Sequence, residues 1–138
     1  MKRKMLAVLV LVMAVMVLLE ACSFSATTAH LKNVTLAKDK DGKTPTTVFG
    51  QNDTFYCVGS LANAPDDTEL TAKWYAVKVT GIEIEPNHLI AERTLKSGTS
   101  GFYFSLVHNQ GSIWPKGDYK VDLYIDGKLI QTLNFKVQ

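Results

Sequence analysis

The end of the chain carries the pattern that most constrains its fold, an alternation of side chains on both sides of a two-residue turn. From Asp118 to Asp126 every second residue is apolar, and the pair Asp126-Gly127 favours a type I′ turn. The residues expected on one face are Tyr119, Val121, Leu123 and Ile125 before the turn, and Leu129, Gln131, Leu133, Phe135 and Val137 after it. The alternation predicts an antiparallel β-hairpin with one buried face and one wetter face.

The residues between the N-terminus and this hairpin also favour short strands. Turn-forming residues recur between β-rich segments, and no long stretch has a helical period. Five further strands are predicted, at Leu31–Lys38, Thr54–Leu61, Leu70–Val79, Leu89–Leu95, and a segment ending near Val107 with Phe102, Phe104 and Leu106 on its inner face. Seven short strands predict an all-β, antiparallel sandwich that occupies residues 30–138 as one domain.

Three features of this domain resemble the immunoglobulin-like layout. Cys57 lies centrally in the second predicted strand, Trp74 lies in the third, and Tyr119 follows Gly117 at the start of the sixth. In that family a strand cysteine and a tryptophan pack against a second cysteine, which comes two residues after a corner tyrosine. Here Tyr119 takes the corner position and Val121 stands where the second cysteine would be. The resemblance implies a buried Cys57 that has no disulfide partner.

The N-terminus has the composition of an export signal. Basic residues at positions 2–4 precede an uninterrupted apolar run from Met5 to Leu19. A helix of this length rises roughly 22 Å, whereas the hydrocarbon core of a bilayer is roughly 30 Å thick. The run therefore predicts the helix of a secretory signal, at residues 1–21, rather than a permanent span.

The tetrapeptide Leu19-Glu20-Ala21-Cys22 resembles the lipobox of bacterial lipoproteins. The resemblance implies that the signal is cut before Cys22 and that this cysteine carries a diacylglycerol thioether. Glu20 departs from the pattern, because that position is usually small or apolar. Two alternatives remain, namely cleavage after Ala29 by the ordinary signal peptidase and an uncleaved anchor. Lipidation at Cys22 and both alternatives place the domain outside the cytoplasmic membrane.

Residues 22–29 follow as the lipidated cysteine and a small, polar tether. Ser23, which stands where an Asp would act as a retention signal, implies the outer membrane if the cell has two membranes. The Trp-Pro-x-Gly-x-Tyr sequence that begins at Trp114 resembles small bacterial envelope lipoproteins with immunoglobulin-like domains, most of which have no assigned activity. The predicted location is therefore the bacterial cell envelope, with the membrane as a partner through the lipid on Cys22.

The charge of the chain argues against nucleic acid as a partner. The sequence has 15 Lys and Arg against 13 Asp and Glu, a net charge of +2. The signal segment holds Lys2, Arg3, Lys4 and Glu20, so everything after residue 21 is neutral. A domain without bulk positive charge lacks the usual electrostatic basis for binding nucleic acid.

The search for catalytic and metal-binding motifs gives mostly negative results. The histidines at positions 30, 88 and 108 have no ligand partners at zinc-site spacing. The mid-strand position of Cys57 predicts burial rather than nucleophilic reactivity. The acidic segments Asp39–Gly42 and Asp66–Glu69 favour turn formation over calcium binding, since Asp and Gly satisfy tight turns locally. We therefore expect neither an enzyme nor a bound cofactor or metal.

Three aromatic residues are the candidate contact residues. Trp114 lies in the loop before the C-terminal hairpin, where it either contacts a partner or folds back to plug the end of the core. Tyr103 and Tyr124 lie on the presumed outer faces and either extend such a contact patch or serve only as strand formers.

The predicted function is a non-enzymatic, membrane-tethered binding module. Its partner would be an envelope protein or a surface glycan. One alternative is a sugar- or small-molecule-binding lipoprotein that uses Trp114 with Tyr103 or Tyr124 as a stacking platform. A further alternative, an envelope hydrolase, would require the side chains of Asp53, His88 and His108 to converge.

Overall fold

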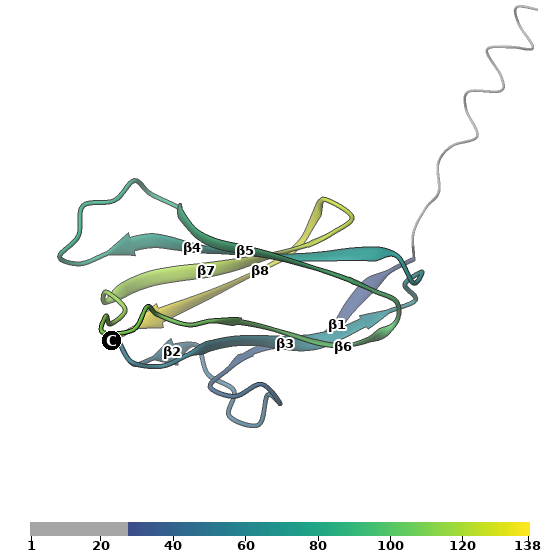
Figure 1. The fold of residues 1–138 in the computed structure, drawn as a ribbon, viewed down its shortest axis with the longest axis horizontal. Helices are drawn as coiled ribbons and strands as arrows, with labels where there is room; N and C mark the ends of the chain where they lie inside the picture. Colours follow the sequence, from purple (N-terminus) through teal and green to yellow (C-terminus); the bar gives the residue numbers. More distant parts are fainter. Residues whose placement is uncertain (1–27) are drawn as a thin grey trace, which may run out of the picture.

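The computed structural model describes residues 28–138, so the predicted signal segment and Cys22 lie outside the described residues. Residues 28–138 form two β-sheets that stack face to face (Figure 1). No helix in this part of the chain is long and apolar enough to cross a membrane. The strands are β1 (His30–Ala37), β2 (Val48–Phe49), β3 (Phe55–Ala62), β4 (Thr68–Val79), β5 (His88–Ser97), β6 (Ser100–Leu106), β7 (Gly117–Ile125) and β8 (Lys128–Val137).

The two sheets have three and five strands. The smaller sheet has the order β1-β3-β6, and the larger has the order β2-β8-β7-β4-β5. Neighbouring strands are antiparallel except at β2, which pairs in parallel with the end of β8. The predicted all-β sandwich is confirmed, but the described residues contain eight strands rather than seven. The additional strand, β2, has only two residues, which is too short to produce a periodic pattern.

The core lies between the sheets and follows the predicted alternation. The inward positions of β4 and β7 are almost completely buried, with Trp74 and Val121 both 0% exposed. From the opposite sheet, β3 and β6 contribute Phe55, Cys57 and Phe104. Each large apolar side chain buried in this way contributes about 1.5–3 kcal/mol to stability, so this layer is the main source of stability in the domain.

The C-terminal hairpin departs from the prediction at Leu129. The turn itself is confirmed, because Asp126 and Gly127 have φ values of 48° and 80°. The pairing of the two strands then shifts by one residue. Leu123 lies opposite Gln131, but the next residue, Tyr124, lies opposite Leu129. Ile130 is therefore an extra residue without a partner in β7. A bulge of this kind reverses the faces on one side of it. Leu129 is therefore on the outer face and 50% exposed, and its predicted place on the buried face is wrong.

The start of β7 has the corner geometry that the sequence implied. The hydroxyl of Tyr119 donates a hydrogen bond to the carbonyl oxygen of Pro115 at 2.6 Å. Gly117 has φ = 151°, and a Cβ there would collide with the carbonyl oxygen of Lys78, so only glycine allows this close approach. Cys57 is a free, buried thiol, and burial raises its pKa to about 12. Its predicted role as a small apolar core residue is confirmed.

Candidate binding site

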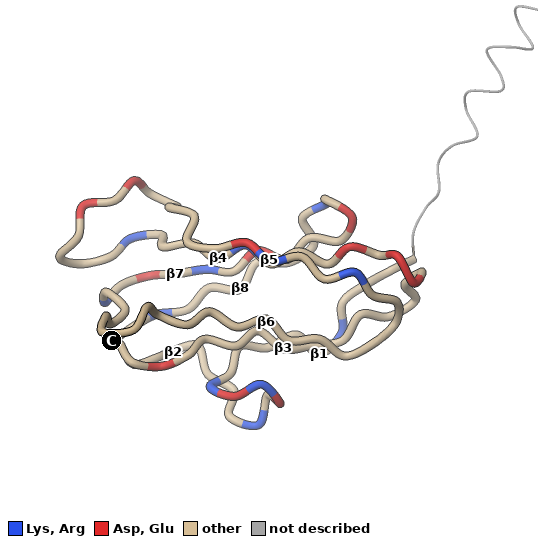
Figure 2. Tube along the Cα trace, in the orientation of Figure 1, with Lys and Arg blue, Asp and Glu red and all other residues tan. Residues whose placement is uncertain are grey.

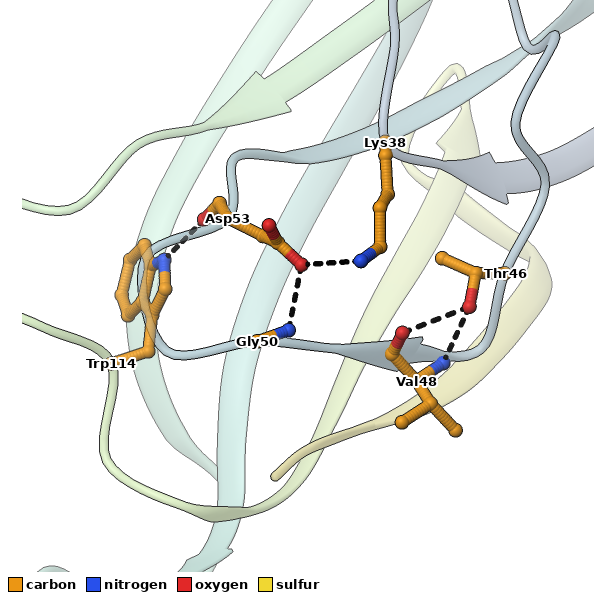
Figure 3. Close-up of polar contacts among 6 residues, drawn as sticks. All are labelled: Lys38, Thr46, Val48, Gly50, Asp53 and Trp114. Atoms are coloured by element: carbon orange, nitrogen blue, oxygen red, sulfur yellow. Dashed lines mark hydrogen bonds and ion pairs between the residues drawn. The ribbon is translucent and has the colours of Figure 1, made fainter.

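Trp114 closes one end of the sandwich. Its side chain is 8% exposed, and its ring stacks on Phe55 with 4.8 Å between centroids. The indole N–H donates to the carbonyl oxygen of Asp53 at 2.9 Å (Figure 3). The backbone N–H of Trp114 donates to the carbonyl oxygen of Gln51 at 2.8 Å. Of the two alternatives for Trp114, these contacts favour the plug, because the ring offers little surface to a partner.

Asp53 is part of the same end structure. Its carboxylate accepts a hydrogen bond from the N–H of Gly50 at 2.6 Å and forms an ion pair with Lys38 at 2.9 Å (Figure 3). The Gly50 hydrogen bond is the largest cause, and Lys38 the next, of a pKa below the ordinary value for this carboxyl. Asp53 thus holds the turn before β3 and is already occupied by groups of its own chain.

The three residues of the hydrolase alternative lie on different elements of the fold, Asp53 before β3, His88 in β5 and His108 after β6. The ring of His108 lies edge-on to Trp114 at 6.1 Å, and its Nδ1 faces the carbonyl oxygen of Asn109 at 3.1 Å. His88 begins β5 in the five-stranded sheet, opposite Ala76. Within residues 28–138, no three His, Cys, Asp or Glu side chains are placed to hold a metal ion. The carboxylate of Asp53 is directed to Lys38.

Tyr124 lies on the outer face of the five-stranded sheet, where its ring already has a partner. The ammonium group of Lys73 lies over this ring at 4.9 Å, and Lys120 lies over the ring of Tyr75 at 4.8 Å. Lys120 also pairs with Asp122 at 3.3 Å. Because these rings and cations satisfy one another, this face is a self-contained polar layer and a poor stacking platform.

The outer face of the three-stranded sheet is different, because a turn folds over part of it. The connection from β1 to β2 returns along β1, with Ala37 bridged to Pro45, and extends beyond the sheet (Figure 1). Charged residues of both signs gather in this turn (Figure 2). Gly42 lies so close to Val58 that a Cβ on it would meet Cγ2 of Val58 at 2.7 Å. This contact covers Val58, which is only 8% exposed although it faces away from the core.

The turn is held by Asp39. Its carboxylate accepts hydrogen bonds from the N–H groups of Asp41, Lys43 and Thr44 at 3.0, 2.9 and 2.7 Å. These bonds, the one from Lys43 first, lower the pKa of Asp39. The turn interpretation of this acidic segment is therefore confirmed. The carboxylate of Asp39 bonds the backbone of this turn, so the turn is a preformed wall beside the sheet.

Tyr103 borders a hollow between this turn and β6. The side chain is 51% exposed, and the ring of Tyr56 lies 6.4 Å away. The hollow has a volume of about 400 Å³. Its lining combines sheet residues, turn residues and Tyr103, among them Asn33, Thr35, Lys40, Asp41 and Ser60. An exposed aromatic ring beside hydroxyl, amide and charged groups is a typical binding surface.

The three candidate aromatics therefore do not form one platform. Trp114 closes an end, Tyr124 belongs to the five-stranded sheet and Tyr103 to the three-stranded sheet. The wall formed by Lys40–Gly42 is not predictable from the sequence, since no local signal shows that this turn folds over the sheet. We take the hollow beside Tyr103 as the candidate binding site.

Comparisons with known proteins show the fold and not the family. No protein-family description matches the sequence, and no curated protein is similar to it at a significant level. Among solved structures, an immunoglobulin-like protein from Pseudomonas aeruginosa matches 83% of this chain and 100% of its own, with 14% identity and a TM-score of 0.55. The domain is therefore an immunoglobulin-like β-sandwich.

Two enzymes contain a similar domain. The alkylpurine DNA glycosylase AlkC of Pseudomonas fluorescens, bound to DNA with an abasic site analog, matches 80% of this chain at 13% identity and a TM-score of 0.50. A β-glucosidase from Listeria innocua, in complex with glucose, matches 81% at 13% identity and a TM-score of 0.50. The chain spans only 30% and 16% of these two proteins, so the similarity concerns one domain of each.

Proposed function

We propose that this chain is a lipid-anchored, extracytoplasmic binding module of the bacterial cell envelope, and that it acts without catalysis. The observation that carries the proposal is the hollow of about 400 Å³ that Tyr103 borders. The side chain of Tyr103 is 51% exposed beside the polar groups that line this hollow. Tyrosine is enriched at binding surfaces, because its ring offers a large amphipathic contact at low entropic cost.

The arrangement of the other polar groups supports binding over catalysis. The carboxylate of Asp53 accepts from the N–H of Gly50 and pairs with Lys38. The carboxylate of Asp39 accepts from the N–H of Lys43, and the Cys57 thiol has a pKa of about 12. A nucleophile requires a lowered pKa or an adjacent base, and Cys57 has the opposite environment. The side chains that remain available around the hollow are an aromatic ring, hydroxyls, an amide and single charges.

The anchor half of the proposal rests on the lipobox-like sequence before Cys22. Two or three acyl chains would hold the domain durably at the membrane. Cells that express wild type and Cys22→Ser are labelled with an alkyne fatty acid and then fractionated. We expect label and membrane association for wild type and neither for Cys22→Ser. Label retained in Cys22→Ser would contradict lipidation at this position.

The binding half is tested by cross-linking in the native cell, followed by purification of the tagged full chain. Tyr103→Ala should reduce the cross-linked partner strongly, whereas Tyr124→Ala should leave it unchanged. Both rings lie on outer faces, so Tyr124→Ala controls for the general loss of a surface tyrosine. Equal recovery from wild type and Tyr103→Ala would contradict the assignment of this surface.

A second candidate function is the binding of a sugar at the same hollow. It is favoured by the mixture of the Tyr103 ring with Asn33, Thr35 and Ser60, since a sugar ring presents an apolar face and hydroxyls. Co-sedimentation of the full chain with purified cell wall distinguishes this candidate. Retention that is lost in Tyr103→Ala would favour it, and no retention would leave a protein as the partner.

A further inference from the structure

The two sheets leave unpaired strand edges on the same side of the sandwich. β5 ends the order of the five-stranded sheet and β6 ends that of the three-stranded sheet, and residues 98–99 join them. An unpaired edge presents backbone N–H and C=O groups that can pair with another strand. Between the two edges lies a groove of about 520 Å³, to which Arg93, Leu95, Phe102 and Phe104 contribute.

Arg93 has an unusual position in this groove. It lies opposite Ala72 in the β4–β5 pair, and Ala72 is 0% exposed, so Arg93 is on the core-facing side of the sheet at its edge. Its neighbours on the outer side have partners, since Glu92 pairs with Lys73 at 3.8 Å and Lys96 with Glu69 at 3.4 Å. Arg93 forms no ion pair with any residue of the described domain.

This position of Arg93 disfavours one occupant of the edge, a second copy of the chain. Antiparallel pairing of two β5 strands, with their outer faces aligned, would place both Arg93 side chains on the same side of the joined sheet. Inward-pointing charges on edge strands protect them against this kind of association. Arg93 instead favours a strand that carries a carboxylate, because a guanidinium group binds a carboxylate through two parallel hydrogen bonds.

We propose that the groove between β5 and β6 binds an extended acidic segment of a partner protein. The segment adds as a strand to β5, places one carboxylate on Arg93 and packs apolar side chains against Leu95 and Phe102. Tyr103 lines both this groove and the hollow, so the inference deepens the proposed binding function and rests on it. Charge complementarity at Arg93 would select such a partner over basic segments.

The test is a selection from displayed peptides with nine randomised positions, on the purified full chain in detergent. We expect enriched peptides with an Asp or Glu among β-branched residues, and affinity that falls roughly tenfold in Arg93→Gln. Arg93→Glu should instead enrich peptides with Lys or Arg. Lys96→Gln is the matched control, since it removes a cation of the same strand on the outer face, and it should bind like wild type.

Several outcomes would overturn the inference. These are a selection without enrichment, enriched peptides without a carboxylate, equal binding to Arg93→Gln, or a stable dimer of the full chain through β5. Thermal unfolding of each variant shows whether it is folded, and the exposed position of Arg93 predicts no change. If the selection fails while Tyr103→Ala still abolishes cross-linking in cells, only the peptide inference is lost and the proposed function stands.

Discussion

The indole nitrogen of Trp114 and the carbonyl oxygen of Asp53 lie 2.9 Å apart, and this hydrogen bond joins two loops at one end of the sandwich (Figure 3). The loop before β7 is thereby fixed to the turn before β3, although 61 residues separate the two partners. The ring of Trp114 also covers Phe55, which is 0% exposed. Trp114 is thus a structural residue of the end cap.

The first prediction concerns the stability contributed by this cap. Trp114→Ala and Trp74→Ala should each lower the free energy of unfolding by about 3–5 kcal/mol, because both rings are buried in the same core. Trp114→Phe should lower the free energy of unfolding by less. It keeps an aromatic ring on Phe55 and loses only part of the packing and the hydrogen bond to Asp53. Urea unfolding followed by circular dichroism measures all three. A loss below about 1 kcal/mol for Trp114→Ala would restore its role as an exposed contact residue.

The second prediction concerns pH. The pKa of Asp53 in the folded state lies below the ordinary value of 3.8. Its ionised form therefore stabilises the fold fully at pH values above 3.8. This stabilisation is lost as the pH falls through the folded-state pKa. Asp53→Asn should therefore be less stable than wild type at pH 7, and the difference should shrink below pH 3.8. Urea titrations at several pH values provide the measurement.

Lys43→Met is the matched control for the ion pair of Asp53 with Lys38. Its ammonium group lies 3.9 Å from Asp41, and its side chain is 81% exposed. Exposed ion pairs of this kind contribute little to stability. Lys38→Met should lower stability at pH 7 by more than Lys43→Met does. A constant difference between Asp53→Asn and wild type across the acid range would mean that the charge of Asp53 is not the cause.

The third prediction separates strain from steric conflict at two glycines. Gly117 and Gly111 both have positive φ values, 151° and 81°, but a Cβ would meet the backbone of Lys78 at Gly117 and nothing within 4 Å at Gly111. Gly111→Ala should cost about 1 kcal/mol through strain alone. Gly117→Ala should cost clearly more, because the end of β4 must move. Equal losses of Tm in a thermal scan would contradict the close approach of β7 to β4.

Much of the fold was predictable, because alternation in a strand is a local property. The buried faces of β4 and β7 and the turn at Asp126-Gly127 all follow from residues that are close in the sequence. The bulge at Ile130 was not predictable in this way, since it depends on how β8 pairs with β7. A single extra residue reversed the face of Leu129, which a strict period of two cannot anticipate.

The candidate site was predictable only in part. Tyr103 was correctly placed on an outer face, but its hollow depends on a turn that reaches Val58 from 16 residues away along the chain. The cation over Tyr124 comes from Lys73, on a strand 51 residues earlier. Contacts of this range arise from the sheet order and leave no local signal, so the sequence could not rank Tyr103 above Tyr124.

The most direct test of the binding surface is site-specific photo-cross-linking in the native cell. A photoreactive phenylalanine derivative replaces Tyr103 in one full-length variant and Tyr124 in another, so that both variants carry the same group on opposite outer faces. We expect a discrete cross-linked product from position 103 and none from position 124. No product from position 103, or equal products from both positions, would contradict the claim that the domain binds through the surface around Tyr103.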